Sequence, residues 1–267
     1  MSISSQRPGL AQSRRNLLAG VSILAVALWP RGARADKGGI PHNGGGQGGG
    51  GAHCFLRGTL IRTPDGEREI GNLAIGDLVM THSGRIRPIK WIGRRRLMRE
   101  REKPWCDEVA PIRVMRSALA EGVPNRDLYL SQWHAIYWEG LLVTIGSLVN
   151  GSTIVRCNAN ERLGLEYLHV ELAGPDIVLA EGVPSETLVF ESGDYSKFDN
   201  WSERLTLDES TKPPVRIMGT VHNITGARRQ LSSRLRSALA PFIDRRTDFD
   251  KLRDKIDERG ERIKAVA

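Results

Sequence analysis

The sequence has little of what several protein classes require. Its 267 residues include only three cysteines, Cys54, Cys106 and Cys157, with no C-x-x-C pair and no cysteine–histidine cluster at zinc-ligand spacing. Aromatic residues make up 6% of the chain, and no apolar run reaches the ~18 residues that would span a membrane. We therefore expect no metal site and no transmembrane span.

Most of the net positive charge comes from the N-terminal region, which has no acidic residue. The chain is formally +8, but residues 1–35 hold five arginines and no acid. The remainder is only +3, with 18 basic and 18 acidic residues over 36–190 and 16 against 13 over 191–267. The excess of positive charge is therefore a property of the N-terminus and does not by itself indicate a nucleic-acid surface.

The N-terminus has the pattern of an export signal. Arg14 and Arg15 precede a short apolar run, residues 17–29, and an Ala-x-Ala site follows at 33–35. The paired arginines are typical of the twin-arginine class, so residues 1–35 are predicted to be a signal peptide and the mature chain to be periplasmic or extracellular. An amphipathic N-terminal helix is the alternative, but the apolar run has no polar face.

Export would place the three cysteines in an oxidising compartment. An odd number leaves at least one of them outside any intramolecular disulfide. A bridge between Cys106 and Cys157 would leave Cys54 as a thiol, although the sequence does not establish the pairing.

Residues 36–53 are predicted to be a flexible linker, because glycine dominates them and almost nothing there can be buried. Short β-forming segments with turn signals every ~8–12 residues come next, a spacing typical of all-β domains. These segments are 60–63, 68–70, 78–81, 86–92, 112–114, 128–130, 135–138, 141–143, 153–155, 168–172 and 177–179. Residues 116–120 and 145–150 suggest short helical turns.

Beyond about residue 190 the sequence becomes mixed and polar, and then helical. Apolar residues recur at helical spacing from residue 228 onward. They are Leu231, Leu235, Leu239, Phe249, Leu252, Ile256 and Ile263. We predict a helical extension packed on the β domain, and no nucleic-acid arm, because few aromatic residues that could stack on bases lie among its basic ones.

A series of small motifs begins at the end of the linker. Cys54-Phe55 is followed by Gly58-Thr59, by TPDG at 63–66, by LAIGDLV at 73–79 and by PIKWIG at 88–93. In this order, after a cysteine at the domain start, they resemble the Hint (hedgehog/intein) family, and most of all its bacterial stand-alone members. The resemblance covers residues 54–188, about half of the chain. It implies an all-β Hint fold of many short strands, here with a C-terminal helical extension.

Two later blocks extend the resemblance. Ser131-Gln132-Trp133-His134 stands where the family carries Thr-x-x-His, and Ser131 keeps the hydroxyl. Residues 167–186 resemble the closing intein blocks, a strand pair whose second arm is 177–182. Inteins finish that arm with His-Asn, whose Asn cyclises to cut the C-terminal junction, whereas this chain has Val-Pro-Ser-Glu at 183–186. The resemblance therefore implies the hedgehog-like half reaction at the N-terminal junction, without full splicing.

The chemistry explains the residue types. A backbone amide is a poor electrophile, so turning the His53–Cys54 bond into a thioester needs the Cys54 thiolate held against the preceding carbonyl. The departing amine needs a proton, a task that suits a histidine, and His134 is the candidate. The Ser131 hydroxyl or nearby amides are expected to stabilise the oxyanion.

Each candidate also has a structural interpretation. Cys54 would be a small buried apolar residue, which is not expected directly after a flexible linker. His134 would be a half-buried strand histidine, and Ser131 a turn or cap hydroxyl. His169 and Asp176 lie in blocks that approach the active centre in the family, but a strand residue and a turn residue are the simpler interpretations of them.

We interpret the chain as an exported, self-processing Hint domain at 54–190 with an extension at 191–267. It would form a thioester at Cys54 by N–S acyl shift and release the segment ending at His53. Its own N-terminal segment is the substrate, and water, a thiol or an amine is the second reactant. No cofactor and no nucleic acid are required. The alternative is an exported Hint-fold binding or structural module without turnover.

The sequence leaves two points open. The family's hedgehog branch uses an acid as general base for the second step, and three acids are candidates for it: Asp107, Glu108 and Asp127. The oligomeric state is not indicated by any pattern in the chain.

Overall fold

The computed structural model describes residues 52–100, 103–158, 163–188, 195–207, 221–222, 227–241 and 243–266. The predicted signal peptide, residues 1–35, lies outside the described residues, and so does nearly all of the predicted linker at 36–53. Much of the predicted extension between 208 and 226 lies outside them as well.

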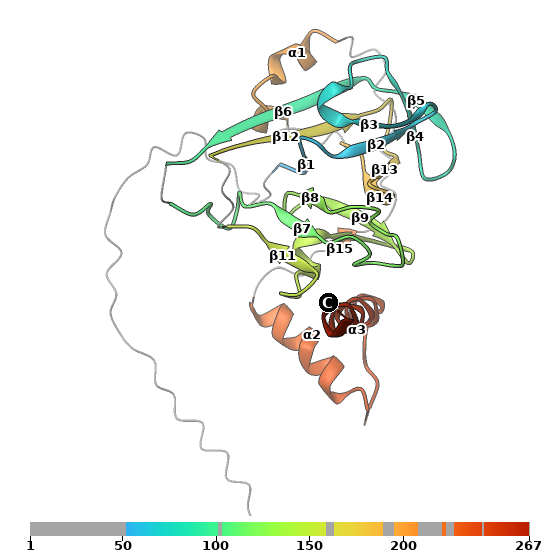
Figure 1. Ribbon diagram of the computed structural model, residues 1–267, viewed down its shortest axis with the longest axis vertical. Coiled ribbons are helices and arrows are strands. Elements are labelled where there is room, and N and C mark those ends of the chain that lie inside the picture. The colour runs from blue at the N-terminus through green and yellow to red at the C-terminus, as the bar shows by residue number, and fades with distance from the viewer. Residues whose placement is uncertain are drawn as a thin grey trace, which may run out of the picture. The chain divides into compact units, whose positions relative to one another are not determined.

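Short strands dominate the described residues, which confirms the predicted all-β class (Figure 1). The strands are β1 (Phe55–Leu56), β2 (Leu60–Thr63), β3 (Gly66–Glu69), β4 (Leu78–Met80), β5 (Ile86–Pro88), β6 (Trp91–Met98), β7 (Ile112–Val114), β8 (Leu128–Leu130), β9 (Ala135–Trp138), β10 (Leu141–Thr144), β11 (Ile154–Arg156), β12 (Gly164–Glu171), β13 (Ile177–Ala180), β14 (Val183–Glu186) and β15 (Val221–His222). The helices are η1 (Ile70–Asn72), η2 (Ile145–Leu148), η3 (Tyr195–Lys197), α1 (Trp201–Leu205), α2 (Ala227–Leu239) and α3 (Asp248–Val266).

The strands form two larger sheets and one hairpin. One sheet has the order β11-β7-β8-β1-β12-β6, the second has the order β15-β10-β9-β14-β13-β2-β3, and β4 pairs with β5. Within the described residues the strands pair antiparallel except for β10 with β15. Although β1 has only two residues, it lies inside its sheet, between β8 and β12. The beginning of the domain is therefore held on both sides by later parts of the chain.

The core follows from the two-residue period of the strands. In β7 and β8 the first and third residues are buried and the central one is partly exposed, so alternate side chains face the interior. Buried apolar residues from both larger sheets, such as Phe55, Ile61 and Ile136, form one cluster. Burial of these apolar surfaces supplies most of the stabilisation of such a domain.

Local turn chemistry sets the β2–β3 hairpin, which was predicted from the sequence. Its register pairs Leu60 with Glu69 and Thr63 with Gly66. The Thr63 hydroxyl donates a hydrogen bond to the Gly66 carbonyl at 2.7 Å, and Gly66 has a φ of 117°, which favours glycine. The predicted helical turn near 145 is also confirmed, as η2.

Two sequence predictions are corrected by the structure. Residues 116–120 form no helix; Ser117 has a φ of 61°, outside the helical region, and Ala120 bridges to Val123 instead. The arm at 177–182 does not pair with the preceding strand, because β13 pairs with β14 and β2, whereas β12 pairs with β6 and β1. The strand β14 at 183–186 was not predicted.

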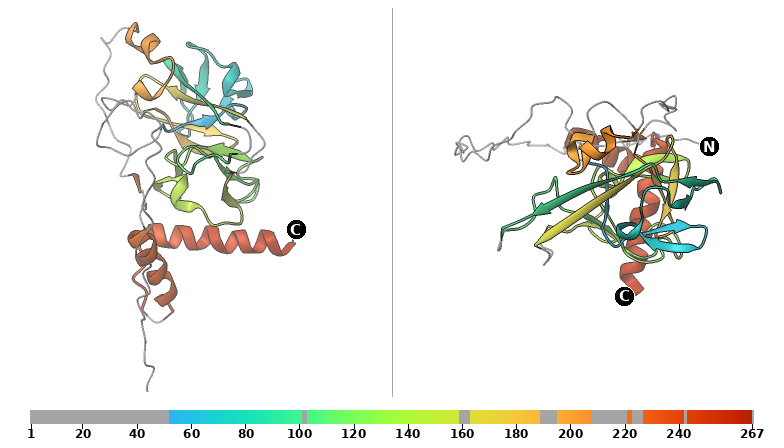
Figure 2. Two further views of the ribbon diagram at one scale, coloured as in Figure 1. Left: turned by 90° about the vertical axis from the view of Figure 1, so that its left-hand side faces the viewer. Right: turned by 90° about the horizontal axis from the view of Figure 1, so that it is seen from above.

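The predicted C-terminal helices are present, and α3 is part of the main core. Phe249, Leu252 and Ile256 belong to the same apolar cluster as the strands. Gly260 faces the segment before β11 so closely that a Cβ there would meet the Ser152 hydroxyl at 2.6 Å. Figure 2 shows α2 meeting α3 near the N-terminal end of α3.

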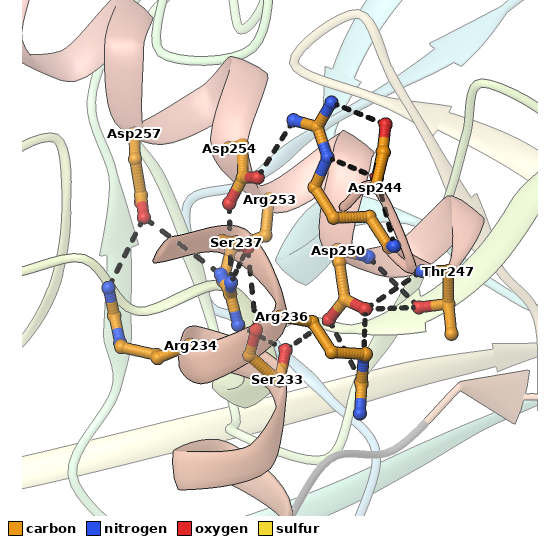
Figure 3. A network of polar contacts seen from close by, with 11 residues as sticks. Ser233, Arg234, Arg236, Ser237, Asp244, Thr247, Asp250, Arg253, Asp254 and Asp257 are labelled. Atoms are coloured by element: carbon orange, nitrogen blue, oxygen red, sulfur yellow. Dashed lines mark hydrogen bonds and ion pairs between the residues drawn. The ribbon is translucent and has the colours of Figure 1, made fainter. Parts of the chain in front are cut away.

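A polar network joins α2 to α3 (Figure 3). The buried carboxylate of Asp250 accepts hydrogen bonds from Ser233, Arg236 and Thr247, and Arg253 donates to Ser233 and to Ser237. Burial raises the pKa of Asp250, but these hydrogen bonds outweigh burial and hold it below its usual range. The attachment of α2 is therefore mainly polar.

As a consequence, the predicted apolar stripe of α2 is not buried. Leu231, Leu235 and Leu239 are all exposed, and Leu231 is 62% exposed. Among the described residues, no helix is long and apolar enough to cross a membrane.

The packing of α3 can be tested with one substitution made at two sites. Leu252→Ala is expected to lower the free energy of unfolding by about 2–5 kcal/mol, because Leu252 is only 2% exposed and packs in the core. Leu231→Ala on α2 is the matched control and should change it by less than about 0.5 kcal/mol. Urea unfolding measures both, and equal effects would show that α3 does not contribute to the core.

Candidate active site

The register in which β1 pairs with its two neighbouring strands determines which residues lie beside Cys54. Phe55 pairs with Leu130 of β8 and with Leu168 of β12, both antiparallel. Because both pairings are antiparallel, the residue before Phe55 lies opposite the residue that follows Leu130 and the residue that follows Leu168. Cys54 therefore lies beside Ser131 and His169. The Ser131 backbone N–H donates to the Cys54 carbonyl at 2.9 Å and continues the ladder.

The peptide bond between His53 and Cys54 is held at both ends by side chains. The Cys54 N–H donates to the Ser131 hydroxyl oxygen at 2.9 Å. The carbonyl oxygen of His53 accepts a hydrogen bond from Nδ1 of His169. The amide nitrogen and the carbonyl oxygen of the candidate scissile bond therefore each contact a different part of the sheet.

The position of Ser131 differs from the one that was expected. Its hydroxyl accepts from the Cys54 N–H and donates to the Ala52 carbonyl at 2.8 Å, so it lies at the nitrogen end of the bond and not at the His53 oxygen. The side chain that contacts that oxygen is His169. In the sequence His169 had only an accessory place among the candidates, because its position at the bond depends on the pairing of β1 with β12.

His169 faces two carbonyl oxygens. Nδ1 contacts the His53 carbonyl, and Nε2 lies 3.3 Å from the Glu186 carbonyl. Burial lowers the pKa of His169 to about 4, more than the nearby Glu186 carboxylate raises it, so the ring is neutral near pH 7. A neutral imidazole donates from one nitrogen only. The closer contact assigns the hydrogen to Nδ1, toward the candidate scissile carbonyl.

His134 completes a cluster of rings with Phe55 and His169. Its ring centroid lies 4.2 Å from that of Phe55 and 5.0 Å from that of His169. Burial, and after it the nearby histidines, lower the pKa of His134 well below 6.5. Neither ring nitrogen has a hydrogen-bond partner within the described part of the chain. A buried imidazole without such partners is destabilising, and a buried group whose pKa is strongly shifted is a candidate for a chemical role.

The three cysteines are all thiols. The disulfide between Cys106 and Cys157 that was considered from the sequence is therefore not formed in this structure. Cys54 is fully buried, and burial raises the pKa of its thiol well above the ordinary value, with smaller opposing contributions from Arg95 and Lys197. The resting nucleophile candidate is thus a neutral thiol that must lose its proton during any reaction.

One residue of the site was missed by sequence analysis. The Glu186 side chain, 10% exposed, accepts hydrogen bonds from Nδ1 of His53 at 2.7 Å and from the Ala135 N–H at 2.8 Å, both at Oε1. It is placed by β14, where Ser185 pairs with Ile136 of β9. The signal that could have indicated it is its position at the end of the closing block, where inteins carry His-Asn.

The other acids named from the sequence have contacts elsewhere. Asp176 is buried and binds Arg85 at 2.9 Å and Arg87 at 3.5 Å. Asp127 binds Arg113, and Asp107 accepts from Asn158. Glu108 is exposed. In the described residues none of these four acids contacts the His53–Cys54 peptide. The ion pairs of Asp176 with two arginines are those of a structural residue.

A comparison with protein families gives a match to the Hint domain. The model of the Hint domain matches residues 53–192, just over half of the chain. Among solved structures, the gp41-1 intein is 15% identical with a TM-score of 0.37, covering 50% of this chain and 98% of its own. The MchDnaB-1 intein is 15% identical with a TM-score of 0.33, covering 49% and 98%. A bacterial intein-like domain from Clostridium thermocellum is 14% identical with a TM-score of 0.35, covering 51% and 98%. No curated protein matches the chain.

The neutral histidines predict a pH dependence of stability. The unfolded chain protonates His134 and His169 near their ordinary pKa of 6.5, whereas the folded chain keeps both neutral. Between about pH 7 and pH 5 the unfolded state therefore binds more protons than the folded state does. As the pH falls through that window, the free energy of unfolding should decrease. The stabilisation is fully present above pH 6.5 and is lost as the pH falls toward the His169 pKa of about 4.

Urea unfolding at a series of pH values checks this expectation. His169→Gln should make the dependence shallower. His82→Gln is the control, because His82 is exposed, and it should leave the dependence unchanged. Identical pH profiles for wild type and His169→Gln would contradict the neutral assignment.

Proposed function

Because the chain belongs to the Hint domain family, whose fold supports self-processing in general, we propose that it forms a thioester at Cys54 and cleaves the His53–Cys54 bond. The observation that carries the proposal is that side chains bind both the carbonyl oxygen and the N–H of this one peptide bond. His169 donates to its carbonyl oxygen, and Ser131 accepts from its N–H.

The first step is attack on the His53 carbonyl carbon. The Sγ–H proton passes to a neutral base as the new S–C bond forms, and His134 is the proposed base because burial keeps its ring neutral. Negative charge develops on the His53 oxygen. The Nδ1–H of His169 already contacts that oxygen, so this donor stabilises the charge without prior rearrangement.

The second step breaks the C–N bond. The departing α-nitrogen of Cys54 receives the proton held by His134, and the electron pair of the bond stays on this nitrogen. Ser131 keeps the nitrogen in place, because its hydroxyl oxygen contacts it while donating to the Ala52 carbonyl. The products are a thioester between His53 and Cys54 and a new amine at Cys54.

The last step is resolution by water, a thiol or an amine. The nucleophile attacks the thioester carbonyl, the Cys54 sulfur leaves and regains a proton, and the segment ending at His53 is released. Full splicing is not proposed, since residues 183–186 form strand β14 with the sequence Val-Pro-Ser-Glu and carry no cyclising asparagine.

Location and boundaries are part of the same proposal. Residues 1–35 would direct export by the twin-arginine route, and 36–53 would form the segment that is released once the signal is removed. Residues 54–190 would be the Hint domain and 191–267 its extension. The proposed chemistry needs only groups of the domain itself and a small nucleophile.

Protein lacking residues 1–35 is expected to yield a fragment that begins at Cys54 when incubated with hydroxylamine or dithiothreitol. Both reagents attack a thioester carbonyl, and intact mass spectrometry identifies the fragment. Cys54→Ala should abolish the reaction. The same fragmentation in the alanine variant would indicate ordinary proteolysis of the glycine-rich segment.

Two histidine variants test the assigned roles. His134→Ala should slow the reaction by at least ~10²-fold through loss of proton transfer, and His169→Ala by ~10²–10³-fold through loss of the oxyanion donor. His82→Ala, on an exposed residue, is the control and should react at the wild-type rate. A His169 variant with an unchanged rate would remove it from the mechanism.

No cleavage near Ser185-Glu186 and no ligated product are expected when a reporter domain is fused after residue 190. The reason is that β14 offers no side-chain amide for cyclisation. Mass spectrometry of the fusion after hydroxylamine treatment is the measurement. A spliced mass would overturn the half-reaction assignment.

A further inference from the structure

We propose that Glu186 forms a binding subsite for a histidine side chain immediately before the scissile bond, so that the domain selectively cleaves acyl segments ending in histidine. This inference rests on the proposed function and adds a substrate preference to it. Glu186 is a specificity and positioning residue, because it touches the side chain of the acyl residue and not the bond that breaks.

The contacts define what the subsite accepts. Glu186 Oε1 lies 2.7 Å from Nδ1 of His53 and 2.8 Å from the Ala135 nitrogen. Oε1 already accepts from the Ala135 N–H, so it is the acceptor in both contacts and Nδ1 of His53 carries the hydrogen. The residue that fits must carry an N–H on the atom bonded to its Cγ, as Nδ1 of histidine is. Histidine does so with Nδ1, and asparagine does so with the isosteric Nδ2, whereas leucine fills similar space without a donor.

Burial makes the preference strong. The Glu186 side chain is 10% exposed, whereas that of His53 is 37% exposed. A buried carboxylate that loses one of its two donors is left poorly solvated, which costs more than the same loss at the surface. Sites built to hydrogen-bond a polar substrate group reject analogues that lack it. The penalty thus falls on acyl residues that have no donor.

The same residue links this subsite to the oxyanion donor. The Glu186 backbone carbonyl lies 3.3 Å from Nε2 of His169, while Nδ1 of His169 contacts the His53 carbonyl. Glu186 and His169 therefore hold one residue, His53, by its side chain and by its carbonyl oxygen. Filling the subsite fixes the direction of the carbonyl before the sulfur attacks, which is the kind of positioning that lowers a barrier.

The experiment changes the acyl residue and compares two replacements of similar size. In protein lacking residues 1–35, His53→Leu should slow hydroxylamine cleavage at least ~10-fold, since a lost charged hydrogen bond of about 1.5 kcal/mol or more corresponds to that factor. His53→Asn, which keeps a side-chain N–H, should be cleaved at least about threefold faster than His53→Leu but more slowly than the chain that keeps His53. In the Glu186→Gln background, the rates with and without His53→Leu should lie closer together. Equal rates for the unchanged chain, His53→Asn and His53→Leu would overturn the subsite.

A second measurement does not depend on turnover. In the Cys54→Ala background, which cannot react, the unfolding equilibrium constants of His53→Leu, Glu186→Gln and the double variant are compared. The subsite predicts that the two changes are not additive, with a coupling of at least threefold, and additivity would overturn it. If the coupling is found but no variant cleaves, the contact stands and the proposed function fails.

Discussion

The proposed chemistry depends on one backbone constraint, the placement of β1 between β8 and β12. A two-residue strand is too short to be stable alone, and β1 persists because both of its edges are paired. Pairing on one side places Ser131 at the Cys54 nitrogen, and pairing on the other places His169 at the His53 oxygen. A slip of one residue on either side would turn these side chains away from the bond.

Burial governs the electrostatics of the site. It raises the pKa of the Cys54 thiol and lowers the pKa values of both His134 and His169, so all three groups rest in their neutral forms. A proton can then pass from sulfur to imidazole and on to nitrogen, and negative charge develops on an oxygen with a donor already in contact. The carboxylate of Glu186 lies on the acyl side, against His53, and not beside the sulfur.

Much of the fold was readable from the sequence, because alternation and turn residues are local signals. The β2–β3 hairpin and the helical spacing of Phe249, Leu252 and Ile256 are examples. The side-chain contacts of the site could not be predicted as well from the sequence. Glu186 reaches the site through the pairing of β14 with β9, which no local pattern encodes. The position of Ser131 at the nitrogen end depends on which neighbour receives each hydrogen bond, and the leucines of α2 stay exposed because polar groups occupy the α2–α3 contact.

The order of these elements along the chain has a consequence for biosynthesis. His169 and Glu186 follow their His53 contacts by 116 and 133 residues. A ribosome therefore completes nearly the whole β domain before either side chain can reach the bond. Under the proposed chemistry a nascent or truncated chain ending before residue 169 keeps this bond intact. The upstream segment would then be released only from chains in which nearly all of the β domain has been made and has folded around the bond.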